Sequence, residues 1–440
     1  MAVGTAGRAT AVLLVAAAVL LTGCSEDRAA DASAGEVTSA AASPTSEGCA
    51  DDVLECARRS SLSDLVPDGA ERATGDPIVL GMLNQENTPA GSYPELSSAV
   101  QAAVAFVNDQ LGGVRGRPLQ VEVCNTGFSP EGSTRCAQQF VQEGVPAVLG
   151  GIDVFGTGID TLAENGVPFV GGIPISESSA TSLASWQWSG GTWAATVAFA
   201  HDAATRLGAE RVAILHPDYA PITSAAEYGR RTLEHEGVEQ VQVVPYPITA
   251  TDLTSPLQAA AASGPDALIV LAADTGCAGA YDGVRTAGIE AQVYLVGACA
   301  APRIVERAGA DAVDGTIVNV ENPLSGPGTA DVDLYLSVLD TYGDGVDPIG
   351  AGTVTFRSFV NLYRILVGLD GEPTAASVTA ALAELRDAPS FMGHPATCDR
   401  AQLAGLPALC SPQQILARFD GTELVALTDD WVDVGAVVPG

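Results

Sequence analysis

The stretch PIVLGMLNQENTPAGSYPELSSAVQAAVAFVNDQLGGVRGRPLQVEVC, residues 77–124, decides the predicted fold. Its first apolar run, 78–83, is typical of a buried strand. A polar loop follows, and then Ser92 and Glu95, whose spacing of three predicts a capping box and a helix that starts at Ser92. Residues 119–123, LQVEV, are expected to be a second strand. Strand, helix and strand at this spacing predict a right-handed parallel crossover.

The same alternation continues along the chain. Further strands are expected at 147–150, 167–170, 211–215, 241–244, 267–271, 293–296 and 316–320, and a closing hairpin at 415–419 and 424–426. Further helices are expected at 134–143, 158–165, 194–207, 224–236, 254–262, 281–287, 332–342, 354–369 and 377–385. Two successive runs of alternating strands and helices predict an α/β protein with two similar lobes.

The phrase AFVNDQLGGVRGRPLQVEV, residues 105–123, with the strand and polar loop before it, resembles the opening of the type I solute-binding proteins of bacterial ABC transporters. Branched-chain amino-acid (Leu/Ile/Val) receptors are the nearest members of that family. The resemblance runs from about Pro77 to about Asp433. It implies two Rossmann-like lobes with parallel sheets, joined by a three-strand hinge that closes on a ligand. By this pattern lobe 1 comprises 77–192 and 323–410, and lobe 2 comprises 193–322 and 411–434.

The first 76 residues precede the region of resemblance. Arg8 and the apolar run 11–21 are typical of an export signal. The tetrapeptide Leu21-Thr22-Gly23-Cys24 resembles a lipobox, which implies cleavage after residue 23 and a lipid on Cys24. An ordinary signal peptide with a chance cysteine is the alternative. Residues 24–76, rich in Ala, Ser, Asp and Glu, are expected to be a flexible tether to the outer face of the cytoplasmic membrane.

Charge and composition exclude several classes of function. The 440-residue chain has a formal net charge of −33, and all 20 of its Lys and Arg residues are arginines. Without lysine the chain cannot contain a Walker-type phosphate loop or a Schiff-base lysine. So acidic a chain is also a poor partner for nucleic acid, because phosphate binding requires a basic face.

Nine cysteines become eight if Cys24 carries a lipid, and an even number in an exported chain predicts four disulfides. Many pairings are possible. Proximity in the sequence suggests Cys49–Cys56, Cys124–Cys136, Cys277–Cys299 and Cys398–Cys410. A zinc site is the alternative interpretation, for which only His394 and Cys398 have a suitable spacing, so no metal is expected.

Loops at the carboxyl ends of parallel strands are where such folds bind ligands. The resemblance places the serine-bearing ligand loop of amino-acid receptors on 151–157, which here holds Asp153, Val154 and Phe155, and the start of the next ligand loop on Gly172 and Ile173. Because Ser and Thr hydroxyls are missing at these positions, the sequence departs from the amino-acid-binding pattern. Backbone amides of the glycine-rich loops could supply donors for a ligand carboxylate, and the glycines would let the backbone approach it closely; tight βα turns are the alternative reason for the glycines.

Three more residues complete the expected site. The resemblance makes Tyr93 an aromatic lid and Tyr219 a wall of the pocket, and Asp274 is the expected partner of a ligand ammonium group. Helix capping is the alternative role of Tyr93 and Asp274. The tryptophans 186, 188 and 193 could stack on a ligand, but packing near the hinge is the favoured interpretation.

The function these observations predict is that of a lipid-anchored substrate-binding protein. It would capture a small polar solute, a branched-chain amino acid or a related compound, and deliver it as a monomer, without a cofactor, to the permease subunits of an ABC importer. An extracytoplasmic sensor of the same fold is the alternative. An enzyme is disfavoured, because the sequence contains no G-x-S-x-G, H-E-x-x-H or phosphate-loop motif.

Overall fold

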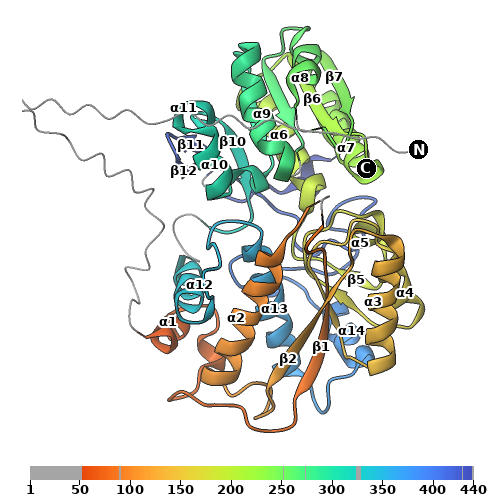
Figure 1. The fold of residues 1–440 in the computed structure, drawn as a ribbon, viewed down its shortest axis with the longest axis vertical. Coiled ribbons are helices and arrows are strands. Elements are labelled where there is room, and N and C mark those ends of the chain that lie inside the picture. The colour runs from red at the N-terminus through yellow and green to blue at the C-terminus, as the bar shows by residue number, and fades with distance from the viewer. Residues whose placement is uncertain are drawn as a thin grey trace, which may run out of the picture. The chain divides into compact units, whose positions relative to one another are not determined.

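The computed structural model describes residues 52–88, 91–250, 252–272, 274–323, 329–428 and 430–438. These residues form two sheets with mainly parallel strands, and helices cover both faces of each sheet (Figure 1). The predicted α/β class with two parallel-sheet lobes is therefore confirmed.

Lobe 1 is built on a five-stranded parallel sheet with the order β2-β1-β3-β4-β5. Its strands are β1 (Ile78–Asn84), β2 (Leu119–Asn125), β3 (Val148–Gly150), β4 (Phe169–Val170) and β5 (Ser185–Trp186). Its helices are α1 (Val53–Arg59), α2 (Pro94–Gln110), α3 (Pro130–Glu143), α4 (Thr157–Glu164), α5 (Glu177–Thr181), α12 (Thr329–Tyr342), α13 (Gly352–Gly368) and α14 (Ala375–Ala383), with a 3-10 turn at Ser63–Leu65.

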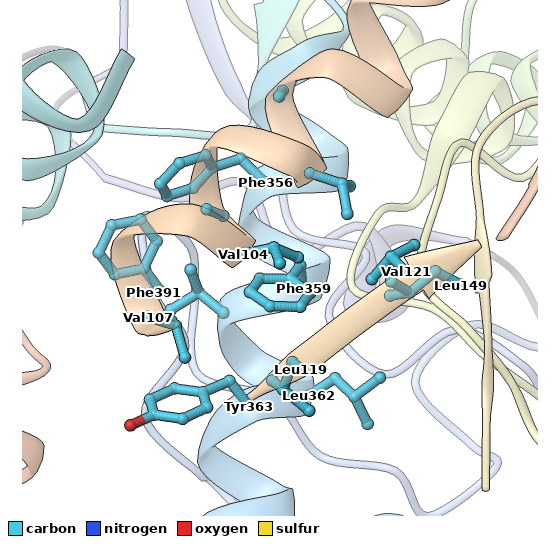
Figure 2. Packing of buried hydrophobic residues seen from close by; sticks show 14 of the residues in the cluster. Val104, Val107, Leu119, Val121, Leu149, Phe356, Phe359, Leu362, Tyr363 and Phe391 are labelled. Atoms are coloured by element: carbon cyan, nitrogen blue, oxygen red, sulfur yellow. The ribbon is translucent and has the colours of Figure 1, made fainter. Parts of the chain in front are cut away.

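Helices α2 and α13 bury one face of this sheet, with α12 packed against α2, and α3 and α4 bury the other face. Figure 2 shows Phe356, Phe359 and Tyr363 of α13 packed beside Val104 and Val107 of α2. All five side chains are at most 7% exposed. Burying this much apolar surface is the main favourable contribution to folding, and it makes α13 a rigid part of lobe 1.

Lobe 2 is built on a seven-stranded sheet with the order β12-β11-β10-β9-β8-β6-β7. Its strands are β6 (Arg211–Pro217), β7 (Gln240–Tyr246), β8 (Ala267–Val270), β9 (Gln292–Leu295), β10 (Ile317–Val320), β11 (Ile415–Asp420) and β12 (Glu423–Ala426). Its helices are α6 (Gly191–Thr205), α7 (Ala220–His235), α8 (Thr254–Ala261), α9 (Asp274–Ala287), α10 (Pro302–Ala308), α11 (Ala310–Val313) and α15 (Val434–Val437), with a 3-10 turn at Gly297–Ala300. The predicted hairpin is confirmed: β11 and β12 pair antiparallel, and Gly421 in the turn has φ +61°.

The segment before Pro77 is folded from Asp52 onward, so a tether that extends to residue 76 is wrong for this part. Helix α1 begins at the N-cap Asp52, whose carboxylate accepts the amide of Leu54 at 2.9 Å. Leu54 and Leu62 are buried in the lobe 1 core, and Asp331 of α12 accepts the amide and the hydroxyl of Ser61 at 2.6 and 2.9 Å. These contacts fix the segment to α12.

Two helices begin elsewhere than predicted. The Ser92 hydroxyl accepts the amide of Asn87 at 3.0 Å instead of capping the helix, and α2 starts at Pro94, which suits a first helical position. Helix α9 starts at Asp274, seven residues before the predicted start at 281. Its first turns contain Gly276 and Cys277, which weakened the periodic apolar signal.

The chain passes between the lobes at three places, which we call the crossings. They lie after β5 at 187–190, after β10 from Glu321, and before β11 at 411–414. The loop that precedes the third crossing extends beyond its expected lobe: Leu403, Leu406 and Leu409 are buried in the lobe 2 core, although the loop was assigned to lobe 1 through residue 410.

Three expected disulfides are present in the described residues: Cys124–Cys136, Cys277–Cys299 and Cys398–Cys410. The fourth expected pair, Cys49–Cys56, depends on Cys49, which lies outside the described residues. The tryptophans 186, 188 and 193 are at most 3% exposed and belong to the two lobe cores. Their packing role is therefore the one the structure supports.

Candidate functional site

The carboxyl ends of β1, β3 and β4 lie side by side in lobe 1. Leu83 is opposite Gly150, and Leu149 is opposite Val170. The loops that leave these ends therefore emerge at one edge of the sheet. We call the loops 84–88 with 91–93, 151–156 and 171–176 the lobe 1 rim.

Asn84, at the end of β1, joins two rim loops with its side-chain amide. Its Oδ1 accepts the amide of Ile152 at 3.2 Å, and its Nδ2 donates to the carbonyl of Tyr93 at 2.8 Å and to Oε1 of Glu86 at 3.0 Å. The residue is completely buried. Asn84 was not among the predicted site residues, although a polar residue at the end of an apolar strand is a signal for such a role.

Asp153 lies in the second rim loop, but its carboxylate faces the interior of lobe 1. Oδ2 accepts the hydroxyl of Ser133 on α3 at 2.6 Å, and the same hydroxyl accepts the amide of Gly158 at 2.7 Å. Only 4% of Asp153 is exposed. This burial raises the pKa of the Asp153 carboxyl above its ordinary value, against the lowering effect of the Ser133 hydrogen bond. The geometry gives Asp153 the role of a clamp between α3 and the start of α4.

Val154 and Tyr219 are the predicted residues that the structure brings together across the lobes. The Tyr219 hydroxyl, at the N-terminus of α7, donates to the carbonyl of Val154. Burial and the nearby charge of Asp153 raise the pKa of Tyr219 to about 12. The next residue, Phe155, is 38% exposed and packs its ring 5.2 Å from that of Phe128.

Gly172 and Ile173 donate their amides inside the protein. The Gly172 amide donates to Oγ of Ser358 on α13 at 3.2 Å, and the Ile173 amide donates to the carbonyl of Gly151 at 3.1 Å. The Gly171 amide also donates internally, to the carbonyl of Trp186 at 2.7 Å. This loop therefore offers none of these three amides to a ligand carboxylate.

Tyr93 is the N-cap residue of α2 and is half-buried against the lobe 1 core. Its amide donates to the carbonyl of Gln85 at 3.0 Å, so its backbone closes the first rim loop. A methyl group on Gly91 would lie 2.9 Å from the Tyr93 hydroxyl, which shows how tightly the ring fits that loop. A lid role for Tyr93 stays a prediction.

The corresponding edge of lobe 2 carries Asp218 and Tyr219 after β6, the start of α9 after β8, and residues 297–301 after β9. We call these residues the lobe 2 rim. The disulfide Cys277–Cys299 joins its second and third parts, and the Tyr281 hydroxyl donates to the carbonyl of Cys299 at 3.3 Å. Asp274 is the first residue of α9, and its expected contact with an ammonium group stays a prediction.

The rims bring together the aromatic side chains of Tyr93, Phe155 and Tyr219, and the exposed ring of Phe155 is an apolar surface suited to binding a solute. A cavity of about 310 Å³ lies elsewhere in lobe 1, between α13 and α14, and is lined by residues that include Trp188, Arg364 and Leu385.

Among the described residues, no group of three or more His, Cys, Asp or Glu could hold a metal ion. None of the described helices is long and apolar enough to cross a membrane.

A family model described as periplasmic binding protein matches residues 77–404. No curated protein sequence is significantly similar to the chain. Among solved structures, a possible leucine/isoleucine/valine-binding protein from Rhodopirellula baltica has a TM-score of 0.69 at 16% identity, over 82% of this chain and 98% of that one.

Two other solved structures have bound solutes. The branched-chain amino acid transporter substrate-binding protein LivJ from Streptococcus pneumoniae, in complex with isoleucine, has a TM-score of 0.65 at 15% identity, over 81% of this chain and 99% of that one. A solute-binding protein of an ABC transporter from Rhodopseudomonas palustris, in complex with 4-hydroxybenzoate, has a TM-score of 0.65 at 20% identity, over 81% of this chain and 97% of that one. At these identities the likeness is one of fold.

Proposed function

The chain belongs to the periplasmic binding protein family, the extracytoplasmic solute-binding proteins of type I fold, and from this premise we propose that it is the substrate-binding protein of an ABC importer. It captures a small polar solute between the two rims and delivers it to the permease subunits as a monomer. It acts as a binding protein rather than an enzyme.

The hydrogen bond from Tyr219 of lobe 2 to the Val154 carbonyl of lobe 1 is the observation that carries this proposal. It brings the two sets of loops together at the carboxyl ends of their strands, where ligands bind in open α/β folds. Phe155, adjacent to this contact and 38% exposed, supplies an apolar surface for the solute.

The proposed function includes a lipid anchor on Cys24, which lies outside the described residues. The tetrapeptide Leu21-Thr22-Gly23-Cys24 supports cleavage and lipidation at that cysteine. Because folding begins by Asp52, the tether is shorter than the sequence first suggested. Mass spectrometry of the membrane fraction is expected to find a diacylglyceryl group on Cys24; an unmodified cysteine would contradict the anchor.

The proposed solute is a branched-chain amino acid or a related compound. The internally bonded amides of Gly171, Gly172 and Ile173 favour the related compound, because a carboxylate finds none of these donors in lobe 1. A solute that packs on aromatic rings fits the rim better than one held by its carboxylate at this loop.

Thermal-shift measurements on residues 25–440 test the proposal. The panel contains branched-chain amino acids, aromatic acids, amides and polyamines. A solute at one hundred times its Kd should stabilise the folded chain by about 2.7 kcal/mol and raise its Tm. A panel without any shift would contradict the proposed function, and turnover of a bound compound would contradict a pure binding role.

Two exposed apolar residues provide a matched pair of variants. Phe155→Ala should weaken solute binding about tenfold, because fully burying a Phe side chain contributes about 1.5–3 kcal/mol and about 1.4 kcal/mol corresponds to a tenfold change in Kd. Leu183→Ala, which removes a side chain that is 69% exposed and outside the rim, should leave binding unchanged. Equal effects of the two substitutions on the Kd for the solute would show that Phe155 is not part of the binding site.

An uptake assay separates an importer from a sensor. Cells that lack the gene should lose uptake of the labelled solute and recover it with the anchored protein. A protein that binds the solute but does not alter its uptake would be a sensor of the same fold.

A further inference from the structure

The three crossings meet at one carboxylate, that of Glu321 at the start of the second crossing. Its Oε1 accepts the hydroxyl of Ser189 and the amide of Gly190, both at 3.0 Å, from the first crossing. The same oxygen accepts Nε2 of Gln414, from the third crossing, at 2.9 Å. One oxygen atom therefore holds all three chain segments that join the lobes.

The other carboxylate oxygen of Glu321 is bound to lobe 1. Nη2 of Arg357, on α13, donates to Oε2 at 2.6 Å, and Nη1 donates to the backbone carbonyl of Glu321 at 2.5 Å. The side chains of Arg357 and Glu321 are only 4% and 11% exposed. Because α13 is packed throughout the lobe 1 core, this ion pair attaches the crossings to a rigid element.

The network continues into lobe 2. Oε1 of Gln414 accepts Nδ2 of Asn319 at 2.8 Å, and Oδ1 of Asn319 accepts the amide of Gly297 in the lobe 2 rim at 2.8 Å. An unbroken series of hydrogen bonds thus runs from α13 through Glu321 and Gln414 to a loop that belongs to the proposed site.

The backbones of the first and third crossings also pack closely against each other near Glu321. A methyl group on Gly190 would lie 2.9 Å from the carbonyl oxygen of Pro412, so the first and third crossings are in direct contact. The loop closed by Cys398 and Cys410 packs its leucines into the lobe 2 core on the way into the third crossing. The three crossings are therefore closely packed at the place where they meet.

We infer that Glu321 and Arg357 are the positioning pair of the hinge: they form the fixed point about which the lobes rotate, and they keep the three crossings aligned during solute capture. A buried ion pair contributes little net stability compared with apolar residues of similar size, because both charges lose their hydration. Its value lies in fixing one arrangement of the segments that meet at it. The consequence for capture rests on the proposed function, whereas the hinge itself can be tested without any solute.

The experiment measures the distance between the lobes by pulsed electron resonance. Residues 25–440 carry Glu164→Cys on α4 and Glu239→Cys before β7, both exposed, each with a spin label. The parent protein should give a narrow distance distribution. Glu321→Gln and Arg357→Met should each widen it, by about twofold, because each removes the ion pair that attaches the crossings to α13.

An ion pair with a buried carboxylate, Asp202 with Arg206, provides the control. Asp202, 5% exposed in its side chain, accepts Nε of Arg206 at 2.7 Å and the hydroxyl of Tyr294 at 2.8 Å, entirely within lobe 2. Asp202→Asn should lower the Tm without widening the distance distribution. If the hinge variants lower the Tm but widen the distribution no more than Asp202→Asn does, the inference is overturned.

The double variant Glu321→Gln with Arg357→Met removes both charges and keeps the inference testable if a single variant fails to fold. The glutamine can still accept hydrogen bonds from the first and third crossings, so the Tm should recover, but the attachment to α13 is lost and the distribution should stay wide. A distribution as narrow as that of the parent protein would show that only charge balance matters and would overturn the inference. Because these measurements use no solute, neither outcome decides whether the protein binds one, which the thermal-shift measurements test separately.

Discussion

The two rims belong to similar βα lobes, yet their loops are held in place by different forces. In the lobe 1 rim the loops are fixed by two hydrogen bonds of the Asn84 side chain, which accepts from the Ile152 amide and donates to the Tyr93 carbonyl, and by glycines that allow backbone segments to touch. In the lobe 2 rim a disulfide, Cys277–Cys299, joins the start of α9 to the loop after β9.

This difference shows that one architecture can prepare a binding surface in two ways. Lobe 1 depends on close packing and buried polar groups, so it is sensitive to a single added methyl group. Lobe 2 depends on a covalent bond, so it should tolerate small changes of packing but respond to loss of the disulfide.

The largest effect is expected from Gly172→Ala in the lobe 1 rim. Gly172 has φ +88°, and a methyl group there would lie 2.6 Å from the carbonyl carbon of Gly150. Left-handed strain of about 1–2 kcal/mol and overpacking of about 1–3 kcal/mol should lower the free energy of unfolding by about 4 kcal/mol in total. Urea denaturation measures this loss.

Gly166→Ala is the matched control. Gly166 has φ +68°, but nothing lies within 4 Å of the added methyl group. Only the left-handed strain of about 1–2 kcal/mol should remain. If both variants lose the same stability, close packing at the lobe 1 rim is not what fixes its loops.

The next effect is expected from the pair Cys277→Ala and Cys299→Ala in the lobe 2 rim. The disulfide spans a sequence separation of 22 residues, and its removal should cost about 3 kcal/mol, chiefly through the greater freedom of the unfolded chain. Amide exchange at 297–301 should become faster, while exchange in the lobe 1 rim stays unchanged. Calorimetry and hydrogen exchange give the two readouts.

The control removes Cys124–Cys136, which joins β2 to α3 with a separation of 12. Its loss should cost a similar amount, about 3 kcal/mol, without faster exchange at 297–301. Equal loosening of the lobe 2 rim in both variants would contradict a local role for Cys277–Cys299.

Much of the fold could be predicted from the sequence, because strands and long helices leave a periodic apolar pattern. The helix at 354–369 was placed within two residues of α13. The docking of residues 52–76 could not be predicted in this way. Helix α1 has only seven residues, and the partner of Ser61 is Asp331, which lies 270 positions away.

The rim positions could also be predicted, since they follow the ends of strands, but the role of each side chain could not. Asp153 was expected to face a ligand, yet its carboxylate accepts from Ser133, twenty residues earlier. The joining of Glu321 to Arg357, Ser189 and Gln414 left no local pattern at all. Such contacts depend on how distant elements pack, which a single sequence does not display.

The smallest effect is expected from Tyr219→Phe, which removes the hydrogen bond from lobe 2 to the Val154 carbonyl. The loss should lower the free energy of unfolding by about 1 kcal/mol at neutral pH. The folded state raises the pKa of Tyr219 to about 12 from its ordinary value of 10.0. The greater stability of the parent protein over the variant should therefore persist below pH 10 and disappear as the pH rises toward 12, because the unfolded chain releases the proton first.

Denaturation of both proteins from pH 8 to 11 measures the trend. Tyr246→Phe, which removes a hydroxyl bonded to Leu271 within lobe 2, is the control for a contact inside one lobe. An advantage that grows with pH would contradict the assigned direction, and equal solute affinities for the Tyr219→Phe variant and the parent protein would show that the contact between the two rims does not contribute to capture.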